Sequence, residues 1–279
     1  MFKITVANQK GGVGKTTSVI SLSAAMAELG KKVLIIDTDA QGSISTILNV
    51  KPEETLYHFL IEGVRFEQCV VNVRPNIDCI FSDKMTEVAE TLLVPRMGRE
   101  KTLAERMEGI NQYDICFVDC APSLSLLQTN AVMYTRYLIL PISMDSLAIA
   151  GARHVQDTFF LLNKYYQVIP TILGVLPTMV DARLTITEQV LASIQELWGM
   201  TNSIILPGIR VDTNLTKANR YHKTIFEYDT GSKAHSRAAD DYQRAAEVIL
   251  EFIEKQKTRK EEEGELIGQE ETSGRDHQV

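Results

Sequence analysis

A glycine-rich run near the start of the chain combines two lysines with two threonines. It reads KGGVGKTT over Lys10–Thr17 and lies between the apolar segment Phe2–Ala7 and the helical-period segment Thr16–Leu29. Glycines let successive backbone N–H groups turn towards phosphate oxygens, and the start of a helix adds its dipole. At this spacing Lys15 would neutralise the β and γ phosphates of a nucleotide, and the Thr16 hydroxyl would ligate Mg²⁺. The expected nucleotide contacts in this run are Lys10, Gly11, Gly12, Val13, Gly14, Lys15, Thr16 and Thr17.

Aspartates end two other apolar segments. Asp37 closes the segment Lys32–Asp37 and is followed by Asp39, whereas Asp119 closes Ile115–Asp119. Carboxylates at the carboxyl ends of parallel strands lie where such sheets place ligands. Following a phosphate-binding run at this distance, Asp119 is expected to hold Mg²⁺ opposite Thr16. A charged turn that simply closes a strand is the alternative interpretation of Asp37 and Asp39.

Apolar, β-rich segments alternate with segments of helical period through most of the chain. This pattern predicts an α/β protein, a P-loop NTPase with a mostly parallel twisted sheet and helices on both faces. We expect strands at Phe2–Ala7, Lys32–Asp37, Ile77–Ser82, Ile115–Asp119, Tyr137–Pro141, Thr171–Pro177 and Ser203–Leu206. We expect helices at Thr16–Leu29, Lys101–Ile110, Leu124–Thr135, Leu147–Tyr165, Thr185–Trp198 and Ser236–Lys257.

The composition indicates a folded domain followed by a polar tail. Residues 1–257 are expected to form one domain, and residues 258–279 lack apolar periodicity and are expected to be disordered. No segment approaches the roughly 18 consecutive apolar residues of a membrane helix, so a cytoplasmic protein is expected. The formal net charge of −7 argues against binding nucleic acid through bulk charge. Buried, reduced thiols are expected for Cys69, Cys79, Cys116 and Cys120.

The glycine-rich run departs from the general P-loop pattern, because Gln9 stands where that pattern has glycine. It matches the deviant pattern K-G-G-x-G-K-[ST]-[ST] instead and resembles the ParA/MinD family of ATPases. The segment from Asp37 to Gly42 is similar to the family's D-x-D-P-Q-G, with Ala40 in place of proline. The segment after Asp119 keeps only part of the family's D-x-P-P-S.

This resemblance implies an ATPase that works as an ATP-dependent homodimer. Lys10 would reach across a two-fold interface to the nucleotide of the partner subunit, where it would act as an arginine finger does. Asp39 would orient the attacking water, and Asp37 would lie near the metal. The loops at Thr178–Arg183 and Pro207–Arg210 resemble family segments that line the adenine, which makes Met179 and Pro207 candidate nucleotide contacts.

Members of this family segregate DNA, position protein cargo over the nucleoid, organise division at the membrane, or act as reductases. The segment 210–237 carries six basic and three acidic residues, a local balance of +3 that favours phosphate contacts without base reading. A mixed-charge surface helix is the alternative interpretation of this segment. The candidate DNA contacts are Arg210, Lys217, Arg220 and Lys223.

Partition of plasmid or chromosome DNA, or positioning of a cargo, is therefore the expected function. It would involve non-specific double-stranded DNA and a centromere-binding or cargo-adaptor protein that stimulates hydrolysis. A membrane-associated division-site ATPase of the MinD type is an alternative, disfavoured because residues 264–271 are acidic and would be repelled by anionic lipid. A metabolic enzyme that uses the same phosphate site is the third hypothesis.

Overall fold

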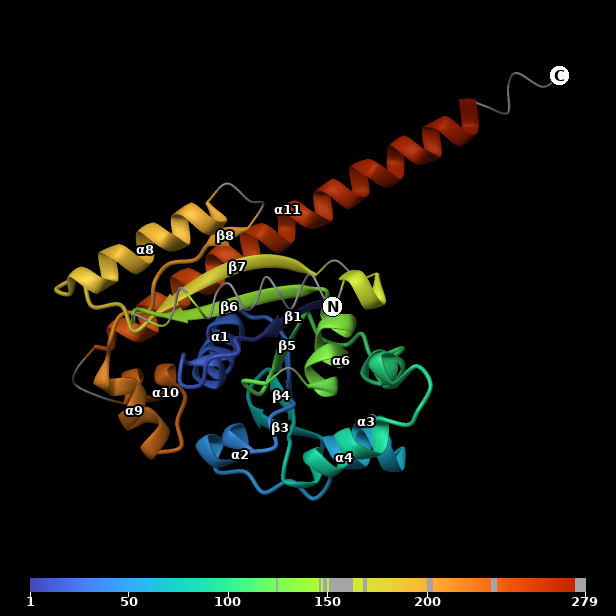
Figure 1. The fold of residues 1–279 in the computed structure, drawn as a ribbon, viewed down its shortest axis with the longest axis horizontal. Coiled ribbons are helices and arrows are strands. Elements are labelled where there is room, and N and C mark those ends of the chain that lie inside the picture. Colours follow the sequence, from blue (N-terminus) through green and yellow to red (C-terminus); the bar gives the residue numbers. More distant parts are fainter. Residues whose placement is uncertain are drawn as a thin grey trace.

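The computed structural model describes residues 1–123, 125–145, 147, 150, 163–167, 170–199, 203–231 and 235–273, with side chains up to Arg259. In this part of the chain, eight strands form a single sheet in the order β3-β4-β2-β5-β1-β6-β7-β8 (Figure 1). All neighbours pair in parallel except β3 and β4. The strands are β1 Phe2–Val6, β2 Val33–Asp37, β3 Val70–Arg74, β4 Ile77–Ile80, β5 Ile115–Asp119, β6 Tyr137–Ser143, β7 Thr171–Thr178 and β8 Ile204–Ile205.

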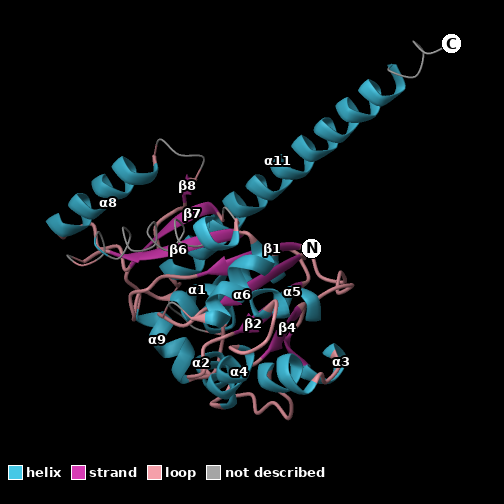
Figure 2. Ribbon diagram, turned by 45° about the vertical axis from the view of Figure 1, so that its right-hand side comes forward, coloured by secondary structure: helices cyan, strands magenta, loops and turns pink. Residues whose placement is uncertain are grey.

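Helices cover both faces of the sheet, as Figure 2 also shows. Those described are α1 Lys15–Glu28, α2 Ser43–Leu48, α3 Phe66–Cys69, α4 Met85–Leu93, α5 Thr102–Arg106, α6 Leu126–Thr135, α8 Thr185–Trp198, α9 Thr213–Arg220, α10 Ile225–Thr230 and α11 Arg237–Ser273. A π-helical turn, His58–Glu62, and a 3₁₀ turn, Arg99–Lys101, complete the set. Among the described residues, no helix combines the length and the apolar character needed to cross a bilayer.

Alternate residues of the central strands enter two separate cores. In β2, Val33 and Ile35 pack with α1 and α11, whereas Leu34 and Ile36 pack on the opposite face with α5, α6 and α8. All five residues of β2 are buried, which is what a parallel strand between two helical layers requires. The α/β P-loop fold predicted from the alternating segments is confirmed. All four cysteines are free and buried, as expected.

Several element boundaries differ from those expected. The antiparallel edge strand β3 was not predicted, and the helix expected at 101–110 is the short α5 preceded by a 3₁₀ turn. The helix expected to end at Lys257 continues to Ser273, because the Lys- and Glu-rich residues beyond Lys257 favour helix. Among its side chains described up to Arg259, the last buried one is Ile253, and Figure 1 shows α11 projecting away from the body. The helix expected at 147–165 lies largely outside the described residues.

Candidate functional site

The glycine-rich run forms a loop between β1 and α1. Gly12 and Gly14 have φ values of +73° and +86°, a left-handed conformation that disfavours any residue with a Cβ. Gly14 precedes the first residue of α1, and no side chain caps this helix end. The first N–H groups of α1 therefore remain available to an anion, which the helix dipole also favours. The Thr178 hydroxyl, at the end of β7, donates to the Val13 carbonyl at 2.9 Å and braces the loop.

The two lysines of the loop face opposite sides. Lys15 is 7% exposed, and its charged neighbours are Asp119 and Asp39. Burial lowers the pKa of Lys15, although these two carboxylates oppose that change. Lys10 instead points towards the end of β6, where its Nζ forms an ion pair with Asp145 and donates to Ser143 Oγ at 3.3 Å. One lysine thus lies over the carboxylates of its own subunit, and the other is turned away from them.

Two carboxylates lie side by side at the carboxyl edge of the sheet. Asp37 and Asp119 are register partners on β2 and β5, and both are buried. Burial raises the pKa of Asp37 well above its ordinary value, and the adjacent Asp119 raises it further. Burial also raises the pKa of Asp119 to about 7, although the nearby Thr16 hydroxyl and Lys15 lower it. Adjacent buried carboxylates of this kind are costly unless a cation compensates them.

These residues fit a hydrated Mg²⁺ ion. At this edge of the sheet, Asp37 Oδ2 and both carboxylate oxygens of Asp119 are buried and make no hydrogen bond to a described residue. Mg²⁺ prefers one or two carboxylates together with waters and substrate phosphates, so a complete protein cage is not needed. Indeed, no group of three or more His, Cys, Asp or Glu side chains with metal-site geometry occurs in the described part of the chain. Thr16, Asp37 and Asp119 thus lie together, as the sequence predicted.

Asp39 lies beyond this pair in the turn after β2. Its backbone N–H donates to Asp37 Oδ1 at 3.0 Å, and its carboxylate accepts from the Gln41 N–H at 3.0 Å. The Ser82 hydroxyl, after β4, donates to the Asp39 carbonyl and holds the turn to the sheet. Asp39 lines a hollow of about 280 Å³ together with Glu87, Glu90 and Pro122. Hydrogen bonds to Asp37 and from Ser82 therefore hold this turn, in which Ala40 stands where the family pattern has proline.

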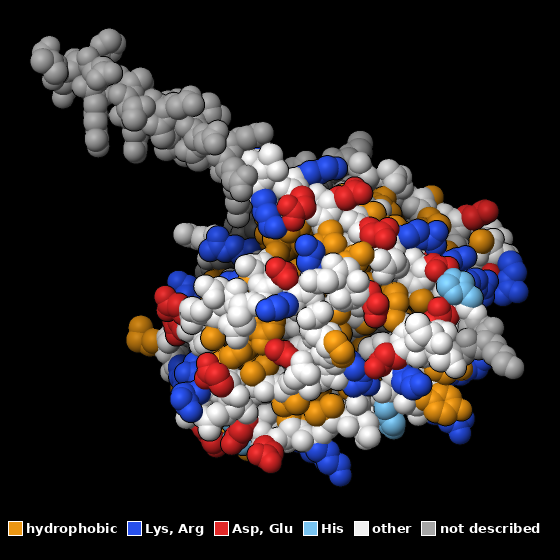
Figure 3. Space-filling model, turned by 180° about the vertical axis from the view of Figure 1, so that it is seen from behind, with side chains coloured by type: hydrophobic (Ala, Val, Ile, Leu, Met, Phe, Trp, Pro, Cys, Tyr) orange, Lys and Arg blue, Asp and Glu red, His pale blue; other side chains and the backbone are white. Residues whose placement is uncertain are grey.

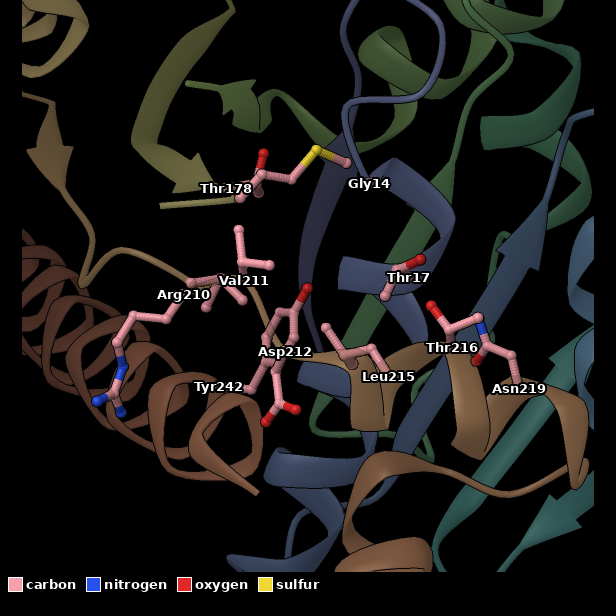
Figure 4. Close-up of a pocket in the computed structure, with 12 residues that line it drawn as sticks. Gly14, Thr17, Thr178, Arg210, Val211, Asp212, Leu215, Thr216, Asn219 and Tyr242 are labelled. Atoms are coloured by element: carbon pink, nitrogen blue, oxygen red, sulfur yellow. The ribbon is translucent and has the colours of Figure 1, made fainter. Parts of the chain in front are cut away.

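A cavity of about 230 Å³ opens on the other side of Gly14 (Figure 4). Its walls come from the P-loop, the end of β7, the segment 209–212, α9 and α11. Of the two predicted adenine contacts, Met179 lines this cavity, whereas Pro207 is not among its described lining residues. The remaining wall was not predicted, because α9 and α11 lie far along the chain and carry no nucleotide motif. The unpredicted lining residues are Leu215, Thr216, Asn219 and Tyr242.

The four candidate DNA contacts separate into two groups. Lys217, Arg220 and Lys223 are exposed on α9 and the turn after it, and none pairs with an acidic side chain in the described part of the chain. Arg210 is different, because its Nε and Nη2 bind the buried Asp241 carboxylate at 2.8 to 3.1 Å. Figure 4 shows its side chain directed towards α11 and away from the cavity. Arg210 therefore already has a structural partner, which the sequence did not indicate.

Charge is mixed over the surface. On the face in Figure 3, Lys and Arg side chains alternate with Asp and Glu. Any DNA binding must consequently be local, as the net charge of −7 suggested.

Comparisons with known proteins match this geometry. A protein-family model described as an AAA domain matches residues 1–169. The sporulation initiation inhibitor protein Soj of Bacillus subtilis (strain 168) is 32% identical over 254 residues, which cover 89% of this chain and 95% of that protein. The chromosome partitioning protein ParA of Caulobacter vibrioides (strain NA1000 / CB15N) is 31% identical over 248 residues, which cover 85% of this chain and 91% of that protein.

One similar solved structure contains bound ligands. Cobyrinic acid a,c-diamide synthase of Mycobacterium smegmatis, with a bound ATP analogue and magnesium, has a TM-score of 0.70 and 27% identity to this chain. The similarity covers 85% of this chain and 99% of that one. Together with the deviant glycine-rich loop and the two aspartates beside it, these matches show that the chain is a P-loop ATPase of the ParA/Soj type within the ParA/MinD family.

Proposed function

We propose that this chain is a partition ATPase that dimerises on binding ATP and Mg²⁺, holds DNA without sequence preference while dimeric, and releases it after hydrolysis. The names of its relatives, Soj and ParA, support a role in chromosome or plasmid partition over a metabolic role. It would act on the nucleoid in the cytoplasm. A centromere-binding or cargo-adaptor protein would stimulate an otherwise slow hydrolysis.

The opposite directions of the two P-loop lysines carry this proposal. Lys15 lies over Asp119 and Asp39, so it serves the triphosphate of its own subunit. Lys10 is turned to β6, away from those carboxylates, and is only partly covered. A cation in this position can serve a nucleotide held by a second subunit. Dimerisation would then complete each site, and a lone subunit would turn over slowly.

The residues of the site divide the chemistry between them. The free N–H groups at the start of α1 and the Lys15 ammonium hold the phosphates. Mg²⁺, when bound, supplies charge neutralisation at the phosphate oxygens. Asp39 orients the attacking water, and Lys10 from the second subunit stabilises the charge that develops on the γ-phosphate. The cavity lined by Met179 and Tyr242 receives the nucleoside.

Light scattering of the purified protein tests the dimer. A non-hydrolysable ATP analogue with Mg²⁺ should give a dimer, and ADP should give a monomer. Lys15→Ala should abolish nucleotide binding, whereas Lys10→Ala should keep binding and lose dimer-dependent turnover. Lys32→Ala is the control, since Lys32 is exposed and precedes β2 at the opposite edge of the sheet. A wild-type protein that stays monomeric with saturating analogue would refute the proposal.

DNA binding is tested by salt titration with ATP and with ADP. Two copies of the α9 surface in one rigid dimer should bind about 10² to 10⁴ times more tightly than one copy. Lys217→Ala and Arg220→Ala should each reduce the salt slope of the dimer by about 2, because each removes one phosphate-neutralising cation from each of the two subunits. Equal affinity with ATP and ADP would contradict the proposal. Flotation with liposomes would instead favour the division-site alternative.

A further inference from the structure

The Lys10 ammonium is held by a set of contacts at the end of β6. Its Nζ pairs with the Asp145 carboxylate and donates to Ser143 Oγ at 3.3 Å. The same carboxylate accepts from the Ser143 hydroxyl at 2.6 Å and from the Leu147 N–H at 3.0 Å. Burial alone would raise the pKa of Asp145, but the hydrogen bonds from Lys10, Ser143 and Leu147 lower it overall. The Asp145 carboxylate is therefore charged in this arrangement, and Ser143 and Leu147 fix its orientation towards Lys10.

The backbone of Lys10 is tied to the same strand. The Asn8 side chain donates to the Pro141 carbonyl of β6 at 2.6 Å and accepts from the Lys10 N–H at 2.9 Å. Asn8 is buried, so this tie is shielded from water. Both the main chain and the side chain of Lys10 are thus held by contacts at β6. A position that keeps the ammonium here cannot at the same time place it on a phosphate of another subunit.

A further hydrogen bond links this position to the phosphate site. Lys15 Nζ donates to the Lys10 carbonyl at 3.2 Å. The Lys15 ammonium has three donors, so a bound triphosphate would share it with the Lys10 carbonyl. Nucleotide binding therefore changes one of the contacts that hold the Lys10 segment, in the same subunit that binds the nucleotide.

We propose that Asp145, oriented by Ser143, is a positioning residue that holds Lys10 within its own subunit until ATP is bound. This inference rests on the proposed function, because it assumes that Lys10 acts in the second subunit. Asp145 disfavours the dimer, and with it dimer-dependent turnover, by competing with the partner's triphosphate for the Lys10 ammonium. The competition is modest, since the Lys10 and Asp145 side chains are 24% and 43% exposed. Such half-exposed pairs shift an equilibrium by about 2- to 5-fold.

The expected effect on the dimer dissociation constant is larger than the effect on a single Lys10–Asp145 pair. Each dimer requires two lysines to leave two aspartates, so the two shifts multiply to about 4- to 25-fold. Asp145→Asn, which removes the charge and keeps the shape, should lower the dimer dissociation constant by this factor at saturating ATP analogue and Mg²⁺. It should also raise unstimulated turnover at protein concentrations where the wild type is mostly monomeric. Analytical ultracentrifugation gives the first quantity and phosphate release the second.

The Lys10→Ala background separates positioning from a general structural effect. In that background Asp145→Asn should change neither quantity, because there is no ammonium left to release. Glu254→Gln is the matched control, since it removes one carboxylate of an exposed pair with Lys257 on α11. It should behave as the wild type does.

Three outcomes would overturn the inference. If the wild type dimerises but Asp145→Asn dimerises no more tightly, or if the shift persists without Lys10, the positioning role is wrong and the proposed function stands. If the wild type itself fails to dimerise with the analogue, the proposed function fails and this inference with it.

Amine labelling in the absence of nucleotide checks the resting contact directly. Lys10 should react more slowly than Lys32 in the wild type and faster in Asp145→Asn than in the wild type. Equal Lys10 labelling in the two proteins would also overturn the inference.

Discussion

Replacing Arg210 by alanine distinguishes a structural arginine from a DNA-binding one. The Arg210 guanidinium makes three hydrogen bonds of 2.8 to 3.1 Å to Asp241, whose side chain is fully buried. Arg244 also pairs with Asp241, and the Arg210 backbone N–H donates to it at 2.9 Å. These contacts fasten the segment 209–212, which lines the cavity beside Gly14, to α11.

The magnitude follows from what remains after the substitution. Removing one partner of a buried ion pair typically costs about 3 to 5 kcal/mol, because the other charge is left uncompensated. Here Arg244 and the Arg210 N–H still hold Asp241, and the Arg210 side chain is 40% exposed, so screening reduces the loss. We therefore expect Arg210→Ala to lower the free energy of unfolding by about 2 kcal/mol. For a domain of this size that corresponds to a melting temperature lower by roughly 4 to 8 °C.

Thermal unfolding and DNA titration on the same samples provide the assay. Arg210→Ala should lower the melting temperature, and nucleotide affinity should fall because the cavity wall loosens. Lys217→Ala and Arg220→Ala should leave stability within about 0.5 kcal/mol of the wild type and weaken DNA binding. If Arg210→Ala leaves the melting temperature unchanged and lowers only DNA affinity, Arg210 is a DNA contact and the structural role assigned to its pair with Asp241 is wrong.

Three further substitutions test the site and its surroundings. Gly14→Ala places a side chain at φ +86°, so it should destabilise the fold by about 1 to 2 kcal/mol. It should also weaken nucleotide binding in calorimetry. The cause is backbone conformation and not a clash, because the nearest side-chain atom, on Thr178, is 3.9 Å from the added Cβ. Asp119→Asn removes an uncompensated buried charge. In metal-free protein at pH 8 the melting temperature should therefore rise, while Mg²⁺-dependent turnover should be lost. A lower melting temperature would contradict this. Asp240 and Asp229 raise the pKa of His235. The contribution of His235 to stability is therefore present below its ordinary pKa of 6.5 and disappears as the pH rises through the raised pKa. His235→Gln should consequently lower the melting temperature at pH 5.5 but not at pH 9.

The central sheet could be predicted because its strands carry strong signals. Runs such as Ile115–Asp119 are wholly buried, and each is bounded by helical segments of clear period. The edge strand β3 has no such signal, since Val70–Arg74 is polar at Asn72 and Arg74 and pairs antiparallel at the border of the sheet. The end of α11 was placed too early because apolar periodicity does not set the limit of a helix rich in Lys and Glu.

The candidate site was predictable where residues lie close together in the sequence and not where the fold brings them together. The P-loop and the three aspartates follow strands at short range, and the structure places them at one edge. Asp145 also follows a strand, but it has no motif around it that would link it to Lys10, 135 positions away. Arg210 appeared free in the sequence because its partner, Asp241, lies on a distant helix.

The order of the strands explains why two lysines five positions apart can have different tasks. β1, which leads into the P-loop, lies between β5 and β6. On the β5 side the sheet presents Asp119, with Asp37 on β2 beyond it, and the charged neighbours of Lys15 are Asp119 and Asp39. On the β6 side it presents Ser143 and Asp145, and Lys10 faces these. The P-loop crosses the edge of the sheet between these two sets of carboxylates. It can therefore hold Lys15 over the candidate metal site and keep Lys10 apart from that site. Neutralising Asp145 while Asp119 stays intact should therefore release Lys10. Dimerisation should then change, while the nucleotide affinity of the single subunit should not.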